Sequence, residues 1–309
     1  MNNIKNKCTF FGQLFLLVTI LVPQITFAAK SDCQIKIEEL FLSRNKKFFN
    51  YKERFYRGMD LSFLNNDELT SQVKAKKLFD LYLMRITETL TETQANELKK
   101  LVSETEYIRN SDSHNGSYSF ATEKSSGEIR VYSLKSLADS FLTYSTLAHE
   151  TEHALKQVLA KSKNISPADY KKTFYENEYE RSNFLDEMGA ISAEWLYLSA
   201  VPQKELDILR DKAEQLKRKI DPNEYKLILI SLEANQYQLI DYLKLNWKNK
   251  RYDYATFKQN RLDDDLNRGH TSDIAFFTVL LSTGTMATYG LYELYNWLSD
   301  DENDETVNE

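Results

Sequence analysis

Two histidines stand four residues apart in the segment His149-Glu150-Thr151-Glu152-His153. On a helix, this spacing places both imidazoles on one face about a turn apart, where two nitrogens can reach one zinc ion at ~2.0–2.1 Å. Glu150 would then lie beside the metal. There its carboxylate can accept a proton from a water molecule whose pKa the zinc lowers toward ~7. The segment therefore predicts a zinc site with Glu150 as general base.

Apolar neighbours favour this interpretation over a simpler one, in which the two histidines are exposed on a polar helix. Leu147 and Ala148 precede the first histidine, and Ala154 and Leu155 follow the second. Few helices bury two histidines without a ligand or a partner. We therefore interpret both histidines as metal ligands.

The same residues resemble the extended signature of the zincin superfamily of metallopeptidases. That signature has Val or Thr three residues before the first histidine and uncharged neighbours around it, and Thr146, Thr151 and Leu155 conform to it. Glu152 departs from it, which leaves the burial of this helical turn open. The resemblance covers about residues 117–200 and implies hydrolysis of peptide bonds on a zincin-like core.

A catalytic zinc site usually has three protein ligands and a water molecule, so a third ligand is required. No third histidine follows His153 in the metzincin spacing, and the next one along the chain is His270. A glutamate on a following helix is then expected, as in the gluzincin branch of the superfamily. The candidate glutamates are Glu176, Glu178, Glu180, Glu187 and Glu194.

Glu187 is the favoured third ligand. Gly189 and Ala190 follow it, and such small residues would let its helix approach the zinc helix closely. This segment also resembles the E-x-x-A element of many gluzincin-like proteins. Glu180 and Glu194 lie seven residues away on either side and share the helical face of Glu187, so they remain alternatives.

A hydrogen-bond donor near the developing oxyanion would complete a hydrolytic site. His270, in a loop that contains Gly269, is the first candidate for this transition-state stabiliser, and the alternative is an exposed loop histidine. The hydroxyls of Tyr179 and Tyr197 are further candidates. His114 ranks below them because its surroundings are those of a polar loop.

Two segments before the zinc motif predict a β-hairpin. Residues 117–120 and 128–132 alternate polar and apolar side chains, with a short polar stretch between them. Zincins place an edge strand beside the active-site helix, where an extended substrate pairs with it. We assign that role to residues 128–132, and an ordinary hairpin that covers the core is an equal alternative.

The rest of the sequence predicts long helices, because the 309 residues include only 8 Gly and 4 Pro. Thr91-Glu92-Thr93-Gln94 predicts a capped helix start, and Ser166-Pro167 predicts another. We therefore expect a mainly α (α+β) fold, in which a zincin-like core with a small β-hairpin is surrounded by long helices.

The expected organisation begins with a signal peptide at residues 1–28. Lys5 and Lys7 precede an apolar run that ends in small residues, so we expect cleavage near Ala28 and an exported protein, periplasmic or secreted. The parts that follow are a helical N-terminal region interpreted as scaffold (29–110), the catalytic core (111–200), a helical C-terminal region (201–299) and an acidic disordered tail (300–309).

Charge and hydropathy narrow the classes of partner. A net charge of −6 argues against a nucleic-acid-binding protein. Residues 274–292 carry no charge and approach the length of a membrane span, but Ser, Thr and Gly dilute their hydrophobicity and the acidic tail opposes the positive-inside trend. We favour a buried helix there over membrane association.

These observations lead to one main functional hypothesis, a zinc-dependent metallopeptidase acting on a peptide or protein substrate. Two alternatives remain. One is a catalytically inactive zincin-like scaffold that binds zinc, and the other is a membrane-attached helical interaction protein in which the histidine motif arose by chance.

Overall fold

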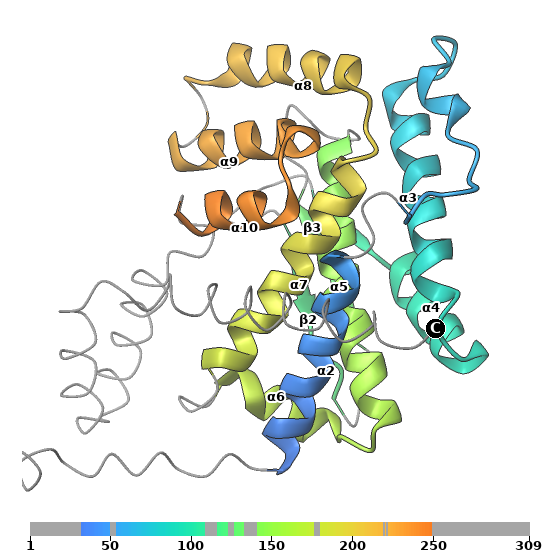
Figure 1. Ribbon diagram of the computed structural model, residues 1–309, viewed down its shortest axis with the longest axis vertical. Coiled ribbons are helices and arrows are strands. Elements are labelled where there is room, and N and C mark those ends of the chain that lie inside the picture. Colours follow the sequence, from blue (N-terminus) through green and yellow to red (C-terminus); the bar gives the residue numbers. More distant parts are fainter. Residues whose placement is uncertain are drawn as a thin grey trace, which may run out of the picture.

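The structure is a computed structural model that describes residues 32–49, 54–108, 116–122, 127–132, 141–175, 180–218, 220 and 222–248. These residues form mainly helices and one small sheet, as the sequence predicts (Figure 1). The predicted signal peptide, the uncharged segment 274–292 and the acidic tail lie outside the described residues.

Helix α5 (Phe141–Ser162) carries the histidine motif and lies in the middle of the described structure (Figure 1). Most of its side chains are buried, because it contacts α3 (Ser71–Thr87), α4 (Glu92–Ser103) and α7 (Glu180–Leu198) as well as the sheet. A helix that is covered on several sides needs apolar or paired side chains all round it. This explains why the motif stands among apolar neighbours.

Helix α2 (Asp32–Phe49) packs against both α5 and α7. Its buried apolar residues Ile37, Leu40 and Phe41 form a small core with residues of α5, α6 and α7. The N-terminal region interpreted as scaffold therefore shares a core with the helix of the histidine motif.

The predicted helix starts are confirmed. Helix α4 opens with a capping box, in which the Thr91 hydroxyl accepts a hydrogen bond from Gln94 N and Gln94 Oε1 accepts one from Thr91 N. Helix α6 (Pro167–Tyr175) begins at a proline after Ser166, whose hydroxyl accepts a hydrogen bond from Asp169 N at 3.0 Å.

In the described part of the chain, three helices follow α7, of which the second and third contact it while the first packs on the second (Figure 1). They are α8 (Gln203–Leu216), α9 (Pro222–Leu232) and α10 (Leu239–Lys248). Single 3₁₀ turns lie at Ser62–Asn65 and Ala234–Gln236. The indole of Trp195 on α7 donates to the Tyr237 carbonyl at 3.2 Å, which ties the turn before α10 to the core.

The sheet has the order β1-β3-β2, with β1 at Glu106–Ile108, β2 at Gly116–Ser119 and β3 at Glu128–Tyr132. Strands β2 and β3 are antiparallel, so the predicted hairpin pairing is confirmed. The parallel partner β1 was not predicted, because a strand of three residues is too short to show an alternating pattern.

The prediction that residues 128–132 form an open edge strand is wrong. Strand β3 is the central strand, and its backbone is already paired with β1 on one side and β2 on the other. Only an edge strand has unpaired N–H and C=O groups to offer an extended peptide. In the described sheet, the edge strand that contacts α5 is β2.

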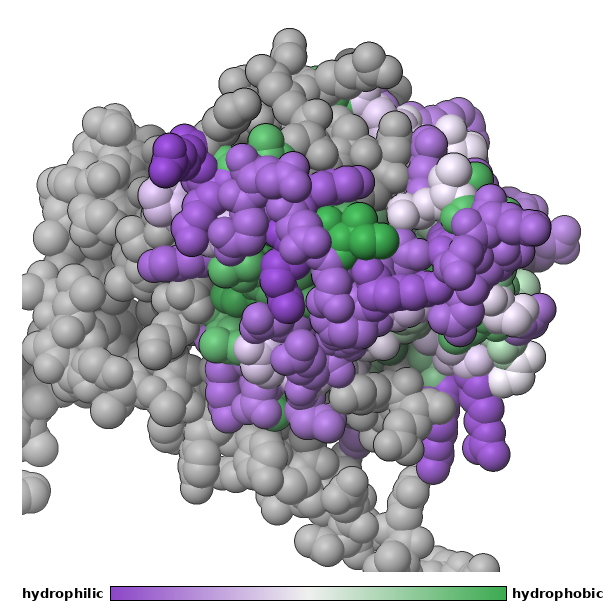
Figure 2. Space-filling view, turned by 90° about the horizontal axis from the view of Figure 1, so that it is seen from above, coloured by the Kyte–Doolittle hydropathy of each residue, from purple (hydrophilic) through white to green (hydrophobic). Residues whose placement is uncertain are grey.

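The described surface is mostly hydrophilic on the face shown in Figure 2, where apolar side chains form small separate patches. The large apolar side chains that are exposed belong to several elements: Ile35, Val73, Met84, Tyr107 and Ile208. None of the described helices is both long enough and apolar enough to cross a membrane.

Candidate metal centre

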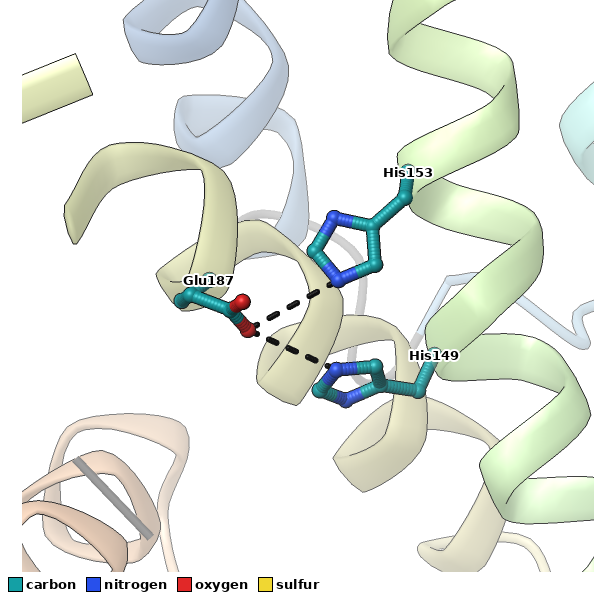
Figure 3. A group of neighbouring side chains, drawn as sticks. All are labelled: His149, His153 and Glu187. Atoms are coloured by element: carbon teal, nitrogen blue, oxygen red, sulfur yellow. Dashed lines mark ion pairs between the residues drawn. The ribbon is translucent and has the colours of Figure 1, made fainter. Parts of the chain in front are cut away.

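The structure brings His149, His153 and Glu187 together, with the two histidines on α5 and the glutamate on α7 (Figure 3). Glu187 Oε2 lies 3.5 Å from His149 Nε2 and 3.6 Å from His153 Nε2. The glutamate side chain is 30% exposed and the histidine side chains are 8% and 10% exposed. Among the described residues, the site is therefore most open at its glutamate.

These two distances suit ligands around a common ion better than a direct hydrogen bond. Hydrogen bonds between nitrogen and oxygen usually span ~2.7–3.2 Å. Two ligand atoms ~2.0–2.1 Å from one tetrahedral zinc ion lie about 3.3–3.4 Å apart. Within the described part of the chain, Glu187 Oε2 is buried and accepts no hydrogen bond. A donor set of two imidazoles and one carboxylate, with this buried oxygen between them, fits zinc.

The second nitrogen of His153 is held by Asp186. Its Nδ1 lies 2.7 Å from Asp186 Oδ2, a hydrogen-bond distance. The other oxygen of this carboxylate lies 2.9 Å from Lys156 Nζ. A carboxylate on the second nitrogen of a ligand histidine fixes the orientation of the ring and leaves Nε2 for the metal.

The second nitrogen of His149 faces Glu194. Its Nδ1 lies 3.4 Å from Glu194 Oε2. The other oxygen of Glu194 accepts hydrogen bonds from Tyr242 OH at 3.2 Å and from Ser231 Oγ at 3.3 Å. Both imidazoles therefore have a carboxylate at Nδ1, and both turn Nε2 toward Glu187.

The surrounding carboxylates change the proton affinity of the site. Burial lowers the pKa of His149, but the nearby carboxylates of Glu187 and Glu194 outweigh burial and raise it to about 10. For Asp186, burial raises the pKa of the carboxyl, and the charges of His153 and Lys156 lower it by more, to well below its usual range. In the metal-free protein, these carboxylates favour protonated imidazoles. A metal ion would have to displace the protons on the two Nε2 atoms in order to bind.

Glu150 lies on the side of α5 that faces β2. A Cβ atom at Gly116 would lie only 2.7 Å from both Glu150 Oε1 and Thr146 Cγ2. Only glycine therefore lets the strand approach the helix this closely. The candidate general base thus lies against the edge strand β2, with 5% of its surface exposed.

Glu152, which departs from the zincin signature, is completely buried and paired with Arg44 of α2. The guanidinium donates from Nε to Oε1 at 2.8 Å and from Nη2 to Oε2 at 2.9 Å. This bidentate ion pair neutralises the Glu152 carboxylate. The helical turn whose burial the sequence left open is therefore buried. The sequence carried no local signal for it, because the two residues are 108 positions apart.

Two other predicted site residues have described side chains, and neither belongs to the three-residue group. Glu194 faces the far nitrogen of His149, and the Tyr197 hydroxyl donates to the Ala75 carbonyl at 2.9 Å. The Glu180 side chain is outside what the structure describes. So are four whole residues among the candidates, namely His114, Glu176, Glu178 and Tyr179, and also His270, the proposed transition-state stabiliser.

Asp186 and Lys156 are site residues that the sequence analysis missed. A signal for Asp186 was present, because a second carboxylate stands directly before the favoured ligand Glu187.

Comparisons with protein-family models, with curated proteins and with solved structures find no match for this chain. The function is therefore argued from the geometry of this site and from its chemistry.

Proposed function

We propose that the protein is a zinc-dependent metallopeptidase, with His149, His153 and Glu187 as the zinc ligands and Glu150 as general base. The observation that carries this proposal is the position of Glu187 Oε2, 3.5 and 3.6 Å from the two Nε2 atoms. Three protein ligands would leave a fourth coordination position for water, the composition typical of a catalytic zinc site.

Zinc bound at this site would polarise a peptide carbonyl and lower the pKa of water toward ~7. Glu150 would accept a proton from the attacking water and then deliver it to the leaving amine nitrogen. Its contact with the strand at Gly116 supports this role, because that contact would limit the orientations that the carboxylate can adopt. Burial also keeps bulk water from competing for that proton.

A zincin-like core is part of the same proposal. Two features of the described fold support it: the motif helix α5 has a short edge strand, β2, along one side, and α7 supplies the glutamate from another. An extended peptide substrate would pair with β2, because β3 is already paired on both sides.

Glu150→Gln tests the enzymatic part of this proposal. The amide is the same size as the carboxylate but cannot accept the proton, so hydrolysis of a peptide library should fall at least about 100-fold. The zinc content should match that of the wild type, because Glu150 is not a ligand. Full activity in this variant would contradict the assigned role.

Gly116→Ala is a second test of the same residue. The added methyl group would push against Glu150 Oε1 and Thr146, so we expect hydrolysis to fall about 10-fold or more while zinc stays bound. Gly58→Ala is the control for a methyl group added in open space, with a loss of stability that comes from its positive φ. Equal activity in Gly116→Ala and the wild type would show that the close approach at Gly116 does not matter for the action of Glu150.

A second candidate function is a zinc-binding protein without hydrolytic activity. The low exposure of Glu150, 5%, favours it, because a general base must reach the substrate. Under this hypothesis the wild type binds zinc and cleaves no peptide in a broad library. Glu150→Gln then changes neither property.

A further inference from the structure

Lys156 is a lysine with no exposed surface, one turn beyond His153 on α5. Its Nζ lies 2.9 Å from Asp186 Oδ1 and also donates to the backbone carbonyl of Asp186. The same ammonium lies 5.2 Å from the centre of the Phe41 ring on α2. Burying a lysine is costly unless its charge is paired, so these contacts need an explanation.

The space for this ammonium is provided by glycine. A Cβ atom at Gly189 on α7 would collide with Lys156 Nζ and with Asn45 Oδ1 of α2. Asn45 in turn donates from Nδ2 to the Leu185 carbonyl at 2.8 Å. Phe41 of α2 and Asp186 of α7 therefore both contact the ammonium of Lys156, and the same Asp186 carboxylate contacts His153.

We propose that Lys156 is a positioning residue of the metal centre. It holds Asp186 at both the carboxylate and the backbone, and Asp186 holds the His153 ring with Nε2 toward Glu187. The inference rests on the proposed zinc site, which it deepens. It assigns to the N-terminal helix α2 a part in metal binding, through the Phe41 ring that lies against the Lys156 ammonium.

The two contacts that Lys156 makes with Asp186 are what give it this role. A carboxylate bound only to an imidazole can rotate about its side-chain torsions, whereas one that also binds a buried ammonium cannot. Loss of such outer contacts to a ligand histidine typically lowers metal affinity about 10–100-fold. We expect Lys156→Met to raise the zinc dissociation constant by a factor in this range.

The matched control is Lys74 on α3. It is also buried and bound to a carboxylate, with Nζ 2.6 Å from Glu205 Oε1 on α8. Lys74→Met removes the same charge from a similarly buried pair. It should destabilise the fold as Lys156→Met does and leave the zinc dissociation constant within about twofold of the wild type.

A double-mutant cycle shows whether Lys156 acts through Asp186. Zinc affinity is measured in the wild type, Lys156→Met, Asp186→Asn and the double variant. If the lysine acts through the aspartate, the double variant binds zinc about as weakly as Asp186→Asn alone. Effects that multiply would mean that the lysine acts by another route, which would overturn the proposal.

The Nδ1 proton of His153 gives a readout that does not depend on zinc. In metal-free protein, NMR should detect it as protected from exchange with solvent in the wild type and in Lys74→Met, and as unprotected in Lys156→Met. Protection that survives in Lys156→Met would overturn the proposal. If the wild type binds no zinc, the proposed function fails. The exchange protection of this proton would still show whether Lys156 positions the His153 ring.

Discussion

The two halves of the candidate metal centre hold their histidines differently. On the His153 side, the carboxylate is 2.7 Å from the imidazole and is bound by a buried ammonium. On the His149 side, the carboxylate is 3.4 Å from the imidazole and accepts hydrogen bonds from two hydroxyls. In these contacts, the carboxylate on the His153 side has a charged donor and short distances. The carboxylate on the His149 side has neutral hydroxyl donors and longer distances.

The two halves also draw on different parts of the chain. Lys156 and Asp186 are packed against α2, near the start of the described residues, whereas Glu194 is bound by Ser231 of α9 and Tyr242 of α10. Both flanking regions thus support the same pair of histidines. Both carboxylates are charged acceptors, but Asp186 also has a charged donor and shorter contacts, so changes on the His153 side should lower zinc affinity more.

The largest effect should come from Arg44→Met, which breaks the buried pair between α2 and Glu152. Removing one partner of such a pair leaves a buried charge and typically costs about 3–5 kcal/mol of unfolding free energy. Urea denaturation should show this loss. Lys76→Met, which breaks an exposed pair with Asp80 on α3, is the control and should cost less than about 1 kcal/mol.

Asp186→Asn should have the next largest effect, a zinc affinity about 100-fold lower than that of the wild type. The amide keeps the shape of the side chain but loses the charge that binds both His153 and Lys156. Competition with a chelator of known affinity measures the change. An effect smaller than that of Glu194→Gln would reverse the comparison between the two halves.

Glu194→Gln should lower zinc affinity about 10-fold, at the lower end of the range for such residues. The contact with His149 is longer, and Glu194 is bound by hydroxyls rather than by an ammonium in the contacts described above. The same chelator competition applies. Complete loss of zinc would instead indicate that Glu194 is itself a ligand, as the sequence left open.

Tyr242→Phe should have the smallest effect, about a threefold loss of zinc affinity. It removes one of the hydroxyl donors to Glu194, whose contact of 3.2 Å is long for an O–H···O bond, and it acts on the zinc ligands only through the Glu194 carboxylate. Ser231→Ala removes the other donor and should behave alike. A loss of about 100-fold in either variant would show that this half is held as tightly as the other.

The ligands could be predicted from the sequence because their arrangement is local. Four-residue spacing on a helix is enough to place His149 beside His153, and small residues after Glu187 allow close helix packing. The support for these ligands could not be predicted in the same way. Arg44 and Glu152 are 108 positions apart in the sequence. The sequence pattern around Arg44, on a helix with both charge signs, does not distinguish a buried arginine from an exposed one.

The small sheet shows a similar division. The pairing of β2 with β3 follows from alternation and a short connection, and it was predicted. The position of β3 in the centre depends on β1, a strand of three residues whose pattern is too short to predict from the sequence. The sequence therefore indicated a hairpin beside α5 but assigned the open edge to the wrong strand.

Zinc content is the most direct test of the central claim. Metal should be measured by elemental analysis of the full chain purified without added zinc. The variants are the wild type, Glu187→Gln and, as a control, Glu97→Gln, whose half-exposed side chain pairs with Lys161. We predict one zinc per chain in the wild type and in Glu97→Gln, and less than about a tenth of that in Glu187→Gln. A wild type without zinc, or a Glu187→Gln variant that keeps it, would contradict the assignment of His149, His153 and Glu187 as the metal centre.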